Sequence, residues 1–467
     1  MSSEAAQEPI ERKLVRVEVT QLLGRFDHEV KFPTGRDFVI LHGPNGIGKT
    51  KLLELIAATF SLDVMTIAEI PFRAAYFEFD DGHLLTVERL GQEALPGLSQ
   101  EEATSESFAM RLRQPGGREI PWDVAESLTQ PENQTALARV LERGDFPVRR
   151  MGPNRWRDIT EGDILSTREV YRRYRDYLPR SAGFKTENAP DEIMHVVGSI
   201  AVHLIETQRL LNLAATVGAR VGREPERQMP TVMEFSRDFS RRLDDNLAQN
   251  SRVSQGLDRS FPKRLLSETA PGQEITEDSI RSRYSQQSEI RRRLTQISVL
   301  DASGELPLPD RTLADWEKRV LWTYLDDTEE KLNTFQPLLD RVALLRDIVN
   351  SRFLYKELTL GREGFKVVTD SGKEIRPNQL SSGEQHELVL TYDLLFNVKP
   401  NSLVLIDEPE ISLHVTWQKE FLNDIVRIAA INSSRFIVAT HSPQIINKFW
   451  SQTVGLEPGY DNETLWA

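Results

Sequence analysis

Eight consecutive residues near the N-terminus have the types and the spacing of a phosphate-binding loop. They fit the pattern GxxxxGK[ST] and are Gly43, Pro44, Asn45, Gly46, Ile47, Gly48, Lys49 and Thr50. Glycines let backbone N–H groups close on phosphate oxygens, and the dipole of a following helix favours the same negative charge. The Lys49 ammonium can reach the terminal phosphates of a nucleotide, and the Thr50 hydroxyl can ligate Mg²⁺. The segment therefore predicts a nucleotide site, with Thr50 as a metal ligand.

Two adjacent carboxylates follow an apolar run in the last part of the chain. The run is 402–406, and Asp407 and Glu408 come directly after it. Because an open α/β sheet places ligand groups at the carboxyl ends of its strands, Asp407 can hold the metal ion, usually through water. Glu408 points elsewhere and can take a proton from an attacking water, which typically contributes about 10²–10⁴ in rate. A strand that merely ends in acidic residues is the structural alternative.

A histidine stands at the end of a second apolar run, 435–440. A single histidine is more often structural than functional, and a structural role is the alternative for His441. The run follows the acidic strand along the chain, however, so His441 can reach the terminal phosphate of a nucleotide. We therefore predict that Glu408 and His441 are catalytic.

Strand and helix patterns alternate around these residues, as they do in α/β proteins. Residues 13–32 predict two strands, and residues 36–60 predict a strand, a glycine-rich loop and a helix. Residues 73–90 predict a hairpin with Asp-Asp-Gly as its turn. Residues 199–211 and 355–369 predict further strands. The expected fold class is α/β.

Long, charged helical sequence fills the middle of the chain. Apolar residues recur there every three or four positions, which puts them on one face of a helix. Two such sets are Val232, Phe235, Phe239, Leu243 and Leu247, and Leu338, Val342, Leu345 and Val349. A helix is also predicted over 277–297, and another begins near Leu313. Pro262, the acidic segment 326–331 and Pro337 are predicted to interrupt helices, which gives a short antiparallel arm with coiled-coil spacing.

These changes of character divide the chain into three predicted parts. Residues 1–215 form the N-terminal lobe of a nucleotide-binding head, with a loop-rich elaboration at about 91–195. Residues 216–354 form the inserted helical arm, and residues 355–467 form the C-terminal lobe of the head.

The composition excludes several kinds of protein. The chain of 467 residues has no cysteine, so disulfides, thiol nucleophiles and zinc sites built on cysteine are excluded. A net charge of −13 argues against coating nucleic acid or an anionic membrane through the overall field, although a local basic patch is still permitted. Neither a signal peptide nor an apolar run of membrane-spanning length is recognisable, so we expect a soluble, cytoplasmic protein without a membrane partner.

Four motifs in a fixed order give the chain a family resemblance. They are GPNGIGKT at 43–50, LSSGEQ at 380–385, LVLIDEPE at 403–410 and ATHSP at 439–443. In this order they resemble an ABC-type ATPase of the SMC, RecF and OLD-like group. The resemblance implies an ABC-type P-loop ATPase head, with a mixed sheet and flanking helices, that binds ATP and Mg²⁺ and hydrolyses the ATP. The helical sequence between the first two motifs resembles the inserted arm of SMC-like heads.

Further site residues follow only from this resemblance. Gln208 would be the Q-loop glutamine that senses the metal ion and the attacking water, and an ordinary surface glutamine is the alternative. Ser381 and Gly383 would be signature residues that contact a nucleotide bound to another chain. The resemblance therefore implies a homodimer or higher homo-oligomer with ATP held between two heads. The D-loop would carry His414-Val415 where many relatives have His-Pro.

Three roles are compatible with these motifs. The first is a sensor or scaffold in bacterial anti-phage defence, resembling the stand-alone ATPases of PARIS or Septu type systems, with a separately encoded nuclease or toxin as effector. Only twenty-six residues follow His441, so no nuclease domain of the OLD type is expected. The second is a RecF-like or SMC-like ATPase of DNA repair or replication, in which basic residues between Arg149 and Arg180 would contact nucleic acid, with a solvated surface as the alternative. The third is an ATP-bound interaction module with negligible turnover.

Overall fold

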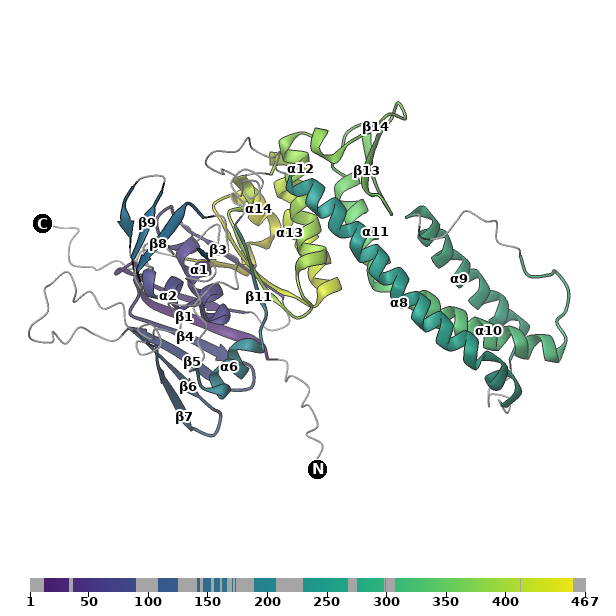
Figure 1. Ribbon diagram of the computed structural model, residues 1–467, viewed down its shortest axis with the longest axis horizontal. Coiled ribbons are helices and arrows are strands. Elements are labelled where there is room, and N and C mark those ends of the chain that lie inside the picture. The colour runs from purple at the N-terminus through teal and green to yellow at the C-terminus, as the bar shows by residue number, and fades with distance from the viewer. Residues whose placement is uncertain are drawn as a thin grey trace, which may run out of the picture. The chain divides into compact units, whose positions relative to one another are not determined.

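The chain folds into two compact units (Figure 1). The first comprises Met1–Gln228 and Val398–Ala467, and the second comprises Met229–Asn397. The computed structural model describes residues 12–32, 37–89, 108–124, 141–142, 146–152, 155–159, 162–165, 170, 173, 189–206, 230–267, 275–297, 299, 307–411 and 413–456.

A six-stranded antiparallel sheet lies in the first unit, in the order β2-β1-β4-β5-β6-β7. Its strands are β1 (Leu14–Leu22), β2 (Phe26–Lys31), β4 (Ala74–Phe79), β5 (Leu84–Arg89), β6 (Phe108–Arg113) and β7 (Glu119–Asp123). The predicted strand pair at 13–32 and the hairpin at 73–90 are confirmed, and Gly82 takes a positive φ of 84° in the hairpin turn. β6 and β7 extend the sheet into a region expected to be loop-rich, because their alternating apolar residues fit one buried face.

A five-stranded parallel sheet in the same unit carries the predicted site, in the order β11-β15-β16-β3-β17. Its strands are β3 (Phe38–His42), β11 (Val202–Glu206), β15 (Leu403–Asp407), β16 (Arg435–Thr440) and β17 (Thr453–Gly455). Asp407 pairs with Ala439, and Thr440 pairs with His42. The carboxyl ends of β15, β16 and β3 therefore lie at one edge of the sheet.

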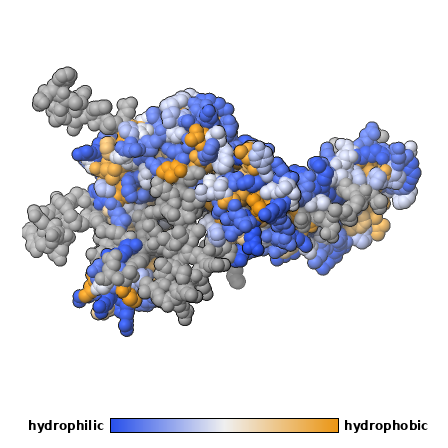
Figure 2. All heavy atoms as spheres, turned by 90° about the horizontal axis from the view of Figure 1, so that it is seen from above, coloured by the Kyte–Doolittle hydropathy of each residue, from blue (hydrophilic) through white to orange (hydrophobic). Residues whose placement is uncertain are grey.

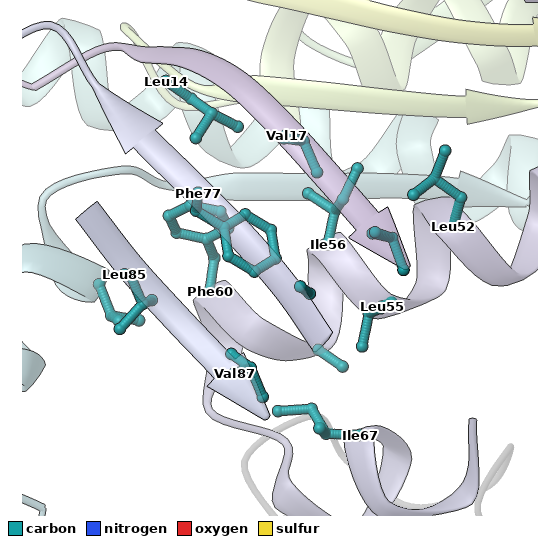
Figure 3. Close-up of a cluster of buried hydrophobic side chains, with 14 of the residues drawn as sticks. Leu14, Val17, Leu52, Leu55, Ile56, Phe60, Ile67, Phe77, Leu85 and Val87 are labelled. Atoms are coloured by element: carbon teal, nitrogen blue, oxygen red, sulfur yellow. The ribbon is translucent and has the colours of Figure 1, made fainter. Parts of the chain in front are cut away.

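Helix α1 (Lys49–Ser61) packs its apolar face into the main hydrophobic core (Figure 3). The side chains of Leu52, Ile56 and Phe60 lie among those of the six-stranded sheet. The Phe60 ring meets the Phe77 ring edge to face, with centroids 5.5 Å apart. Since burying one such side chain contributes about 1.5–3 kcal/mol, the core fixes the helix whose first residues are Lys49 and Thr50.

Further strands and helices complete the first unit. A three-stranded antiparallel sheet has the order β10-β9-β8. The elements are β8 (Val148–Gly152), β9 (Arg155–Asp158), β10 (Ile164–Leu165), α2 (Val64–Glu69), α6 (Asp191–Gly198), η5 (Pro409–Ile411), α13 (Val415–Asn432), α14 (Pro443–Ile446) and η6 (Asn447–Gln452). The parallel sheet and its flanking helices confirm the predicted α/β class.

The second unit combines long helices with a small antiparallel sheet in the order β12-β13-β14. Its elements are α8 (Thr231–Ser267), α9 (Glu277–Gln296), α10 (Asp315–Asn333), α11 (Gln336–Asn350), β12 (Lys356–Gly361), β13 (Gly364–Thr369), β14 (Glu374–Ile375), η3 (Pro377–Gln379), α12 (Ser382–Tyr392) and the π-helix η4 (Asp393–Asn397). The inserted helical region is therefore confirmed.

Two of the three predicted helix breaks are wrong. α8 continues through Pro262, and α10 continues through the acidic segment 326–331. Packing of α8 against α10 stabilises both helices, and the buried Asp327 carboxylate forms an ion pair with Arg264 of α8. The break at Pro337 is confirmed, because this proline lies in the first turn of α11, where the missing N–H costs nothing.

The boundary between the units differs from the predicted one at 354/355. Residues 355–397 belong to the unit of the long helices, because β12 packs on α11 and β13 packs on α8. The contact is close: the Ser236 hydroxyl of α8 accepts a hydrogen bond from the Phe365 N–H at 2.8 Å. A Cβ atom at Gly364 would lie 2.6 Å from the Ser236 carbonyl oxygen.

Membrane-spanning helices are absent from the described part of the chain, since none of its helices is both long and apolar enough. On the face drawn in Figure 2, apolar residues occur in small groups among hydrophilic ones.

Candidate nucleotide site

The loop between β3 and α1 has a backbone that allows close approach of a ligand. Gly46 and Gly48 take φ angles of 82° and 92°, in the left-handed region that other residues rarely adopt. Gly43 faces a different constraint, because a Cβ atom there would lie 2.6 Å from the Leu456 carbonyl oxygen. That carbonyl is held in place, since the Leu456 N–H donates to the His42 carbonyl at 2.8 Å. The loop thus needs glycine at three of its positions.

Lys49 is buried at the start of α1, with its ammonium turned back over the loop. Its Nζ donates to the Gly43 carbonyl at 2.9 Å and to the Pro44 carbonyl at 3.1 Å. Burial lowers the pKa of Lys49, and neighbouring carboxylates, Glu408 foremost, oppose that shift. A bound anion beside Nζ would favour the charged form in the same way.

Thr50 joins the loop to the acidic strand. Its hydroxyl donates to Oδ2 of Asp407, at the end of β15, at 2.8 Å. The two oxygens are hard ligands of the kind that Mg²⁺ prefers. Among the residues that the structure describes, no group of three or more histidine and carboxylate side chains could hold a metal ion by itself. The donor set therefore fits Mg²⁺ that arrives with phosphates and keeps several waters, rather than a resident ion in a protein cage.

Glu408 and His441 face each other at the ends of β15 and β16. His441 Nε2 lies 3.6 Å from Oε1 of Glu408, and His441 Nδ1 lies 3.3 Å from the Lys49 ammonium. Because an ammonium group only donates, Nδ1 accepts and the ring proton lies on Nε2, towards Glu408. The backbone of Glu408 has a left-handed φ of 47°, and its N–H donates to the Ala439 carbonyl at 2.9 Å. β16 thus fixes the turn that aims the Glu408 side chain.

Glu410 also lies at the site, although no role was predicted for it from the sequence. Its carboxylate accepts from the Thr440 hydroxyl at 2.8 Å and from the His441 backbone N–H at 2.6 Å. One side chain from the turn after β15 therefore fixes the backbone at the end of β16. The only signal in the sequence was its place in the tetrapeptide Asp-Glu-Pro-Glu.

Two other residues that the sequence did not single out support the same loops. Gln418 of α13 accepts from the Ser442 hydroxyl at 2.8 Å and donates to the Glu410 carbonyl at 3.2 Å. The buried His28 of β2 donates from Nε2 to the Ile47 carbonyl at 2.8 Å. The first residue joins the turn after β15 to the turn after β16, and the second fixes the glycine-rich loop from the antiparallel sheet.

The two signature residues belong to the second unit, at the N-terminus of α12. Ser381 caps this helix, and its N–H and hydroxyl both donate to Oε2 of Glu384 at 2.9 Å. The Lys356 ammonium holds the same carboxylate at 2.7 Å. Ser381 is exposed, and Gly383 is half-buried. Gln208, the predicted Q-loop residue, lies outside the described residues.

His414, in the predicted D-loop segment, marks the start of the helix that follows. It precedes α13 as the N-cap residue, and its Nδ1 accepts from the Thr416 N–H at 3.4 Å. A histidine followed by valine can therefore start this helix without the proline found in many relatives of the resembled group.

One family model matches the chain, over residues 226–447, which is a little under half of its length. The model is described as "AAA domain, putative AbiEii toxin, Type IV TA system". The matched region contains the signature segment, both carboxylates and His441. Together with the phosphate loop, this match supports a P-loop ATPase with an AAA-type domain.

Solved structures that match the chain include heads of SMC proteins. The Smc head domain with an extended coiled coil from Pyrococcus furiosus, bound to the C-terminal domain of ScpA, is 13% identical with a TM-score of 0.36 and covers 96% of this chain and 94% of its own. The SMC head domain from Thermotoga maritima is 10% identical with a TM-score of 0.32. The match covers 95% of this chain and 94% of that one. An SmcHead bound to the C-winged helix domain of ScpA is 12% identical with a TM-score of 0.35. The match covers 95% of this chain and 93% of that one. No curated protein matches the chain.

Proposed function

We propose that this chain binds ATP with Mg²⁺ and hydrolyses it. The observation that carries the proposal is the meeting of a lysine, a hydroxyl–carboxylate pair and a glutamate–histidine pair at one edge of the parallel sheet. They are Lys49, Thr50, Asp407, Glu408 and His441. Hydrolysis of a phosphoanhydride needs little covalent chemistry from a protein, so positioning and charge are the main requirements.

Each of these groups has one task in the proposed reaction. Lys49 and the amides of the loop bind the phosphates, and Thr50 and Asp407 would hold Mg²⁺, which when bound neutralises phosphate charge. Glu408 accepts the proton of the attacking water at Oε1. The Nε2–H group of His441 lies 3.6 Å from Oε1 of Glu408, which is beyond hydrogen-bond distance, and it donates to the terminal phosphate and orients it.

Phosphate release from ATP tests this enzyme assignment. We expect steady-state release by the purified chain that requires Mg²⁺ and stops when EDTA is added. Lys49→Met keeps the length of the side chain but removes the ammonium, so ATP binding and turnover should both fall. Absence of Mg²⁺-dependent turnover in the wild type would refute hydrolysis and leave a non-catalytic ATP-binding module.

We further propose that two copies associate through ATP, with Ser381 and Gly383 of one copy contacting the nucleotide of the other. The exposed N-terminus of α12 supports this proposal, because helix N-termini favour anions. Ser381→Arg should leave ATP binding by a single copy intact while abolishing ATP-dependent dimerisation and turnover. Sedimentation with and without ATP measures the association. Full activity of the variant would contradict the proposed role of the signature residues.

We propose that the biological role is that of an ATP-dependent sensor or scaffold in anti-phage defence, acting with a separately encoded effector. The description of the matching family model as a putative toxin of a Type IV TA system supports this role. Phage plating on cells that carry the gene with its neighbours should show protection that Glu408→Gln abolishes. Equal plating with and without the genes would contradict the role, and DNA-stimulated turnover would favour the RecF-like or SMC-like alternative.

A further inference from the structure

The small sheet of β8, β9 and β10 presents a row of arginines on one face. Arg149 of β8 lies directly opposite Arg157 of β9, and Arg157 lies opposite Ile164 of β10. Arg155 lies two residues before Arg157 and so shares its face. Arg149, Arg155, Arg157 and Ile164 are all exposed, so this face of the sheet points to solvent.

The opposite face of the same sheet is packed. Trp156 is fully buried there in a cluster with Met65 and Leu165. Arg150, which pairs with Trp156 across the strands, lies on this inner side, with its guanidinium 5.8 Å from the Trp156 ring and 3.2 Å from the Glu142 carboxylate. The alternation thus places Arg150, which is itself exposed, on the side of Trp156 and the other three arginines on the opposite side.

Within the part of the chain that the structure describes, Arg149, Arg155 and Arg157 form no ion pair. The nearby carboxylates of Asp158 and Asp163 instead contact Arg173, at 2.9 Å and 3.5 Å.

This arrangement opposes the stability of the free sheet. Like charges directly across two strands destabilise their pairing, and here Arg149 and Arg157 occupy such positions. The chain as a whole carries a net charge of −13, whereas this small sheet carries three arginines that form no ion pair with any described residue. A ligand that carries negative charge would remove the repulsion.

Aliphatic side chains accompany the arginines. Met151 and Ile159 are each 60% exposed, and Ile164 is 55% exposed. Arginine and methionine are enriched in the cores of protein interfaces. Covering exposed aliphatic side chains lowers the free energy, because their surface is removed from water. Single-stranded nucleic acid would instead need exposed aromatic rings for stacking, and the tryptophan of this sheet is buried.

We propose that this outer face, defined by Arg149, Arg155, Arg157 and Ile164, binds a segment of another protein in which carboxylates alternate with aliphatic side chains. The arginines pair with the carboxylates, and Ile164 and the neighbouring exposed Met151 cover the aliphatic groups. The surface does not include the nucleotide site, so the proposal does not depend on ATP hydrolysis.

Fluorescence anisotropy with the full-length protein tests the proposal. The probes are a labelled synthetic peptide that alternates glutamate with valine, the same peptide with serine in place of valine, and a labelled DNA duplex. We expect the glutamate–valine peptide to bind best and Arg157→Glu to weaken it by about tenfold or more, which corresponds to about 1.4 kcal/mol. Arg149→Glu should act in the same direction. Arg150→Gln, on the packed face, is the matched control and should leave peptide binding unchanged.

Thermal unfolding of the same variants separates a binding role from a structural one. Because Arg157→Glu replaces a repulsive cross-strand pair with an attractive one, its Tm should equal or exceed that of the wild type. Loss of peptide binding together with a lower Tm would overturn the proposal, since Arg157 would then support the fold. Tighter binding of the DNA duplex than of the peptide, or binding that Arg157→Glu does not change, would overturn it as well.

Discussion

Glu410→Gln tests how the turn after β15 and the end of β16 are held together. The change keeps the size of the side chain but removes its charge and one of its two acceptor oxygens. In the wild type these oxygens accept from the Thr440 hydroxyl and the His441 N–H at 2.8 Å and 2.6 Å. A glutamine can satisfy only one of these donors and turns an amide N–H₂ group towards the other.

The expected size of the effect follows from those two hydrogen bonds. Bonds to a charged partner contribute about 1.5–3 kcal/mol, and neutral ones contribute about 0.5–1.5 kcal/mol. Replacing one and losing the other therefore costs about 1.5–5.5 kcal/mol in the positioning of His441. Because this loss raises the barrier of the hydrolysis step, kcat for ATP should fall by about 10- to 10⁴-fold. The KM for ATP should change little, because Glu410 forms no hydrogen bond to the phosphate loop in the described part of the chain.

Steady-state phosphate release over a range of ATP concentrations separates kcat from KM. Glu420→Gln is the matched control, because it removes the same charge from an exposed residue of α13. A kcat equal to that of the wild type would refute the positioning role of Glu410. So would a rise in KM that accounts for the whole loss of kcat/KM, since the side chain would then act on binding.

Two further predictions concern stability. Burial lowers the pKa of His386 to about 4 from an ordinary value of 6.5, so between these values the unfolded chain binds a proton that the folded chain does not. The free energy of unfolding should therefore fall by up to about 3 kcal/mol as the pH drops from 6.5 to 4. In urea unfolding, the free energy of unfolding of His386→Leu should lack this part of the pH dependence. The same pH dependence in the variant and the wild type would contradict the role of His386. Gly43→Ala should lower the Tm and weaken ATP binding, because its Cβ atom would meet the Leu456 carbonyl oxygen. Gly46→Ala should lower the Tm less, because its Cβ atom has free space and only the backbone is strained. Equal losses of Tm in the two variants would contradict the steric explanation.

The local motifs of the head could be predicted because each is a short pattern with a fixed structural meaning. Parallel strands that are buried on both faces appear as continuous apolar runs, so the ends of β15 and β16 were recognisable from 403–407 and 435–440. The glycine-rich loop was recognisable because its positive φ angles require glycine.

Contacts between distant segments could not be predicted in this way. The role of Glu410 depends on where β16 ends, and those residues are thirty to thirty-one positions away along the chain. The same reason explains the two wrong helix breaks, since local propensity disfavours Pro262 and the charges at 326–331 while packing between α8 and α10 stabilises both helices. The assignment of 355–397 to the second unit likewise follows from contacts of β12 and β13 with helices, which no local pattern contains.

The proton-accepting role of Glu408 is the central claim, and Glu408→Gln tests it most directly. The variant keeps the size of the side chain, and Lys49, Thr50 and Asp407 remain to bind ATP with Mg²⁺. Turnover and the Kd for ATP should be measured on the same preparation. We expect an unchanged Kd and a turnover lower by about 10²–10⁴-fold. A variant that hydrolyses ATP at the wild-type rate would contradict the account.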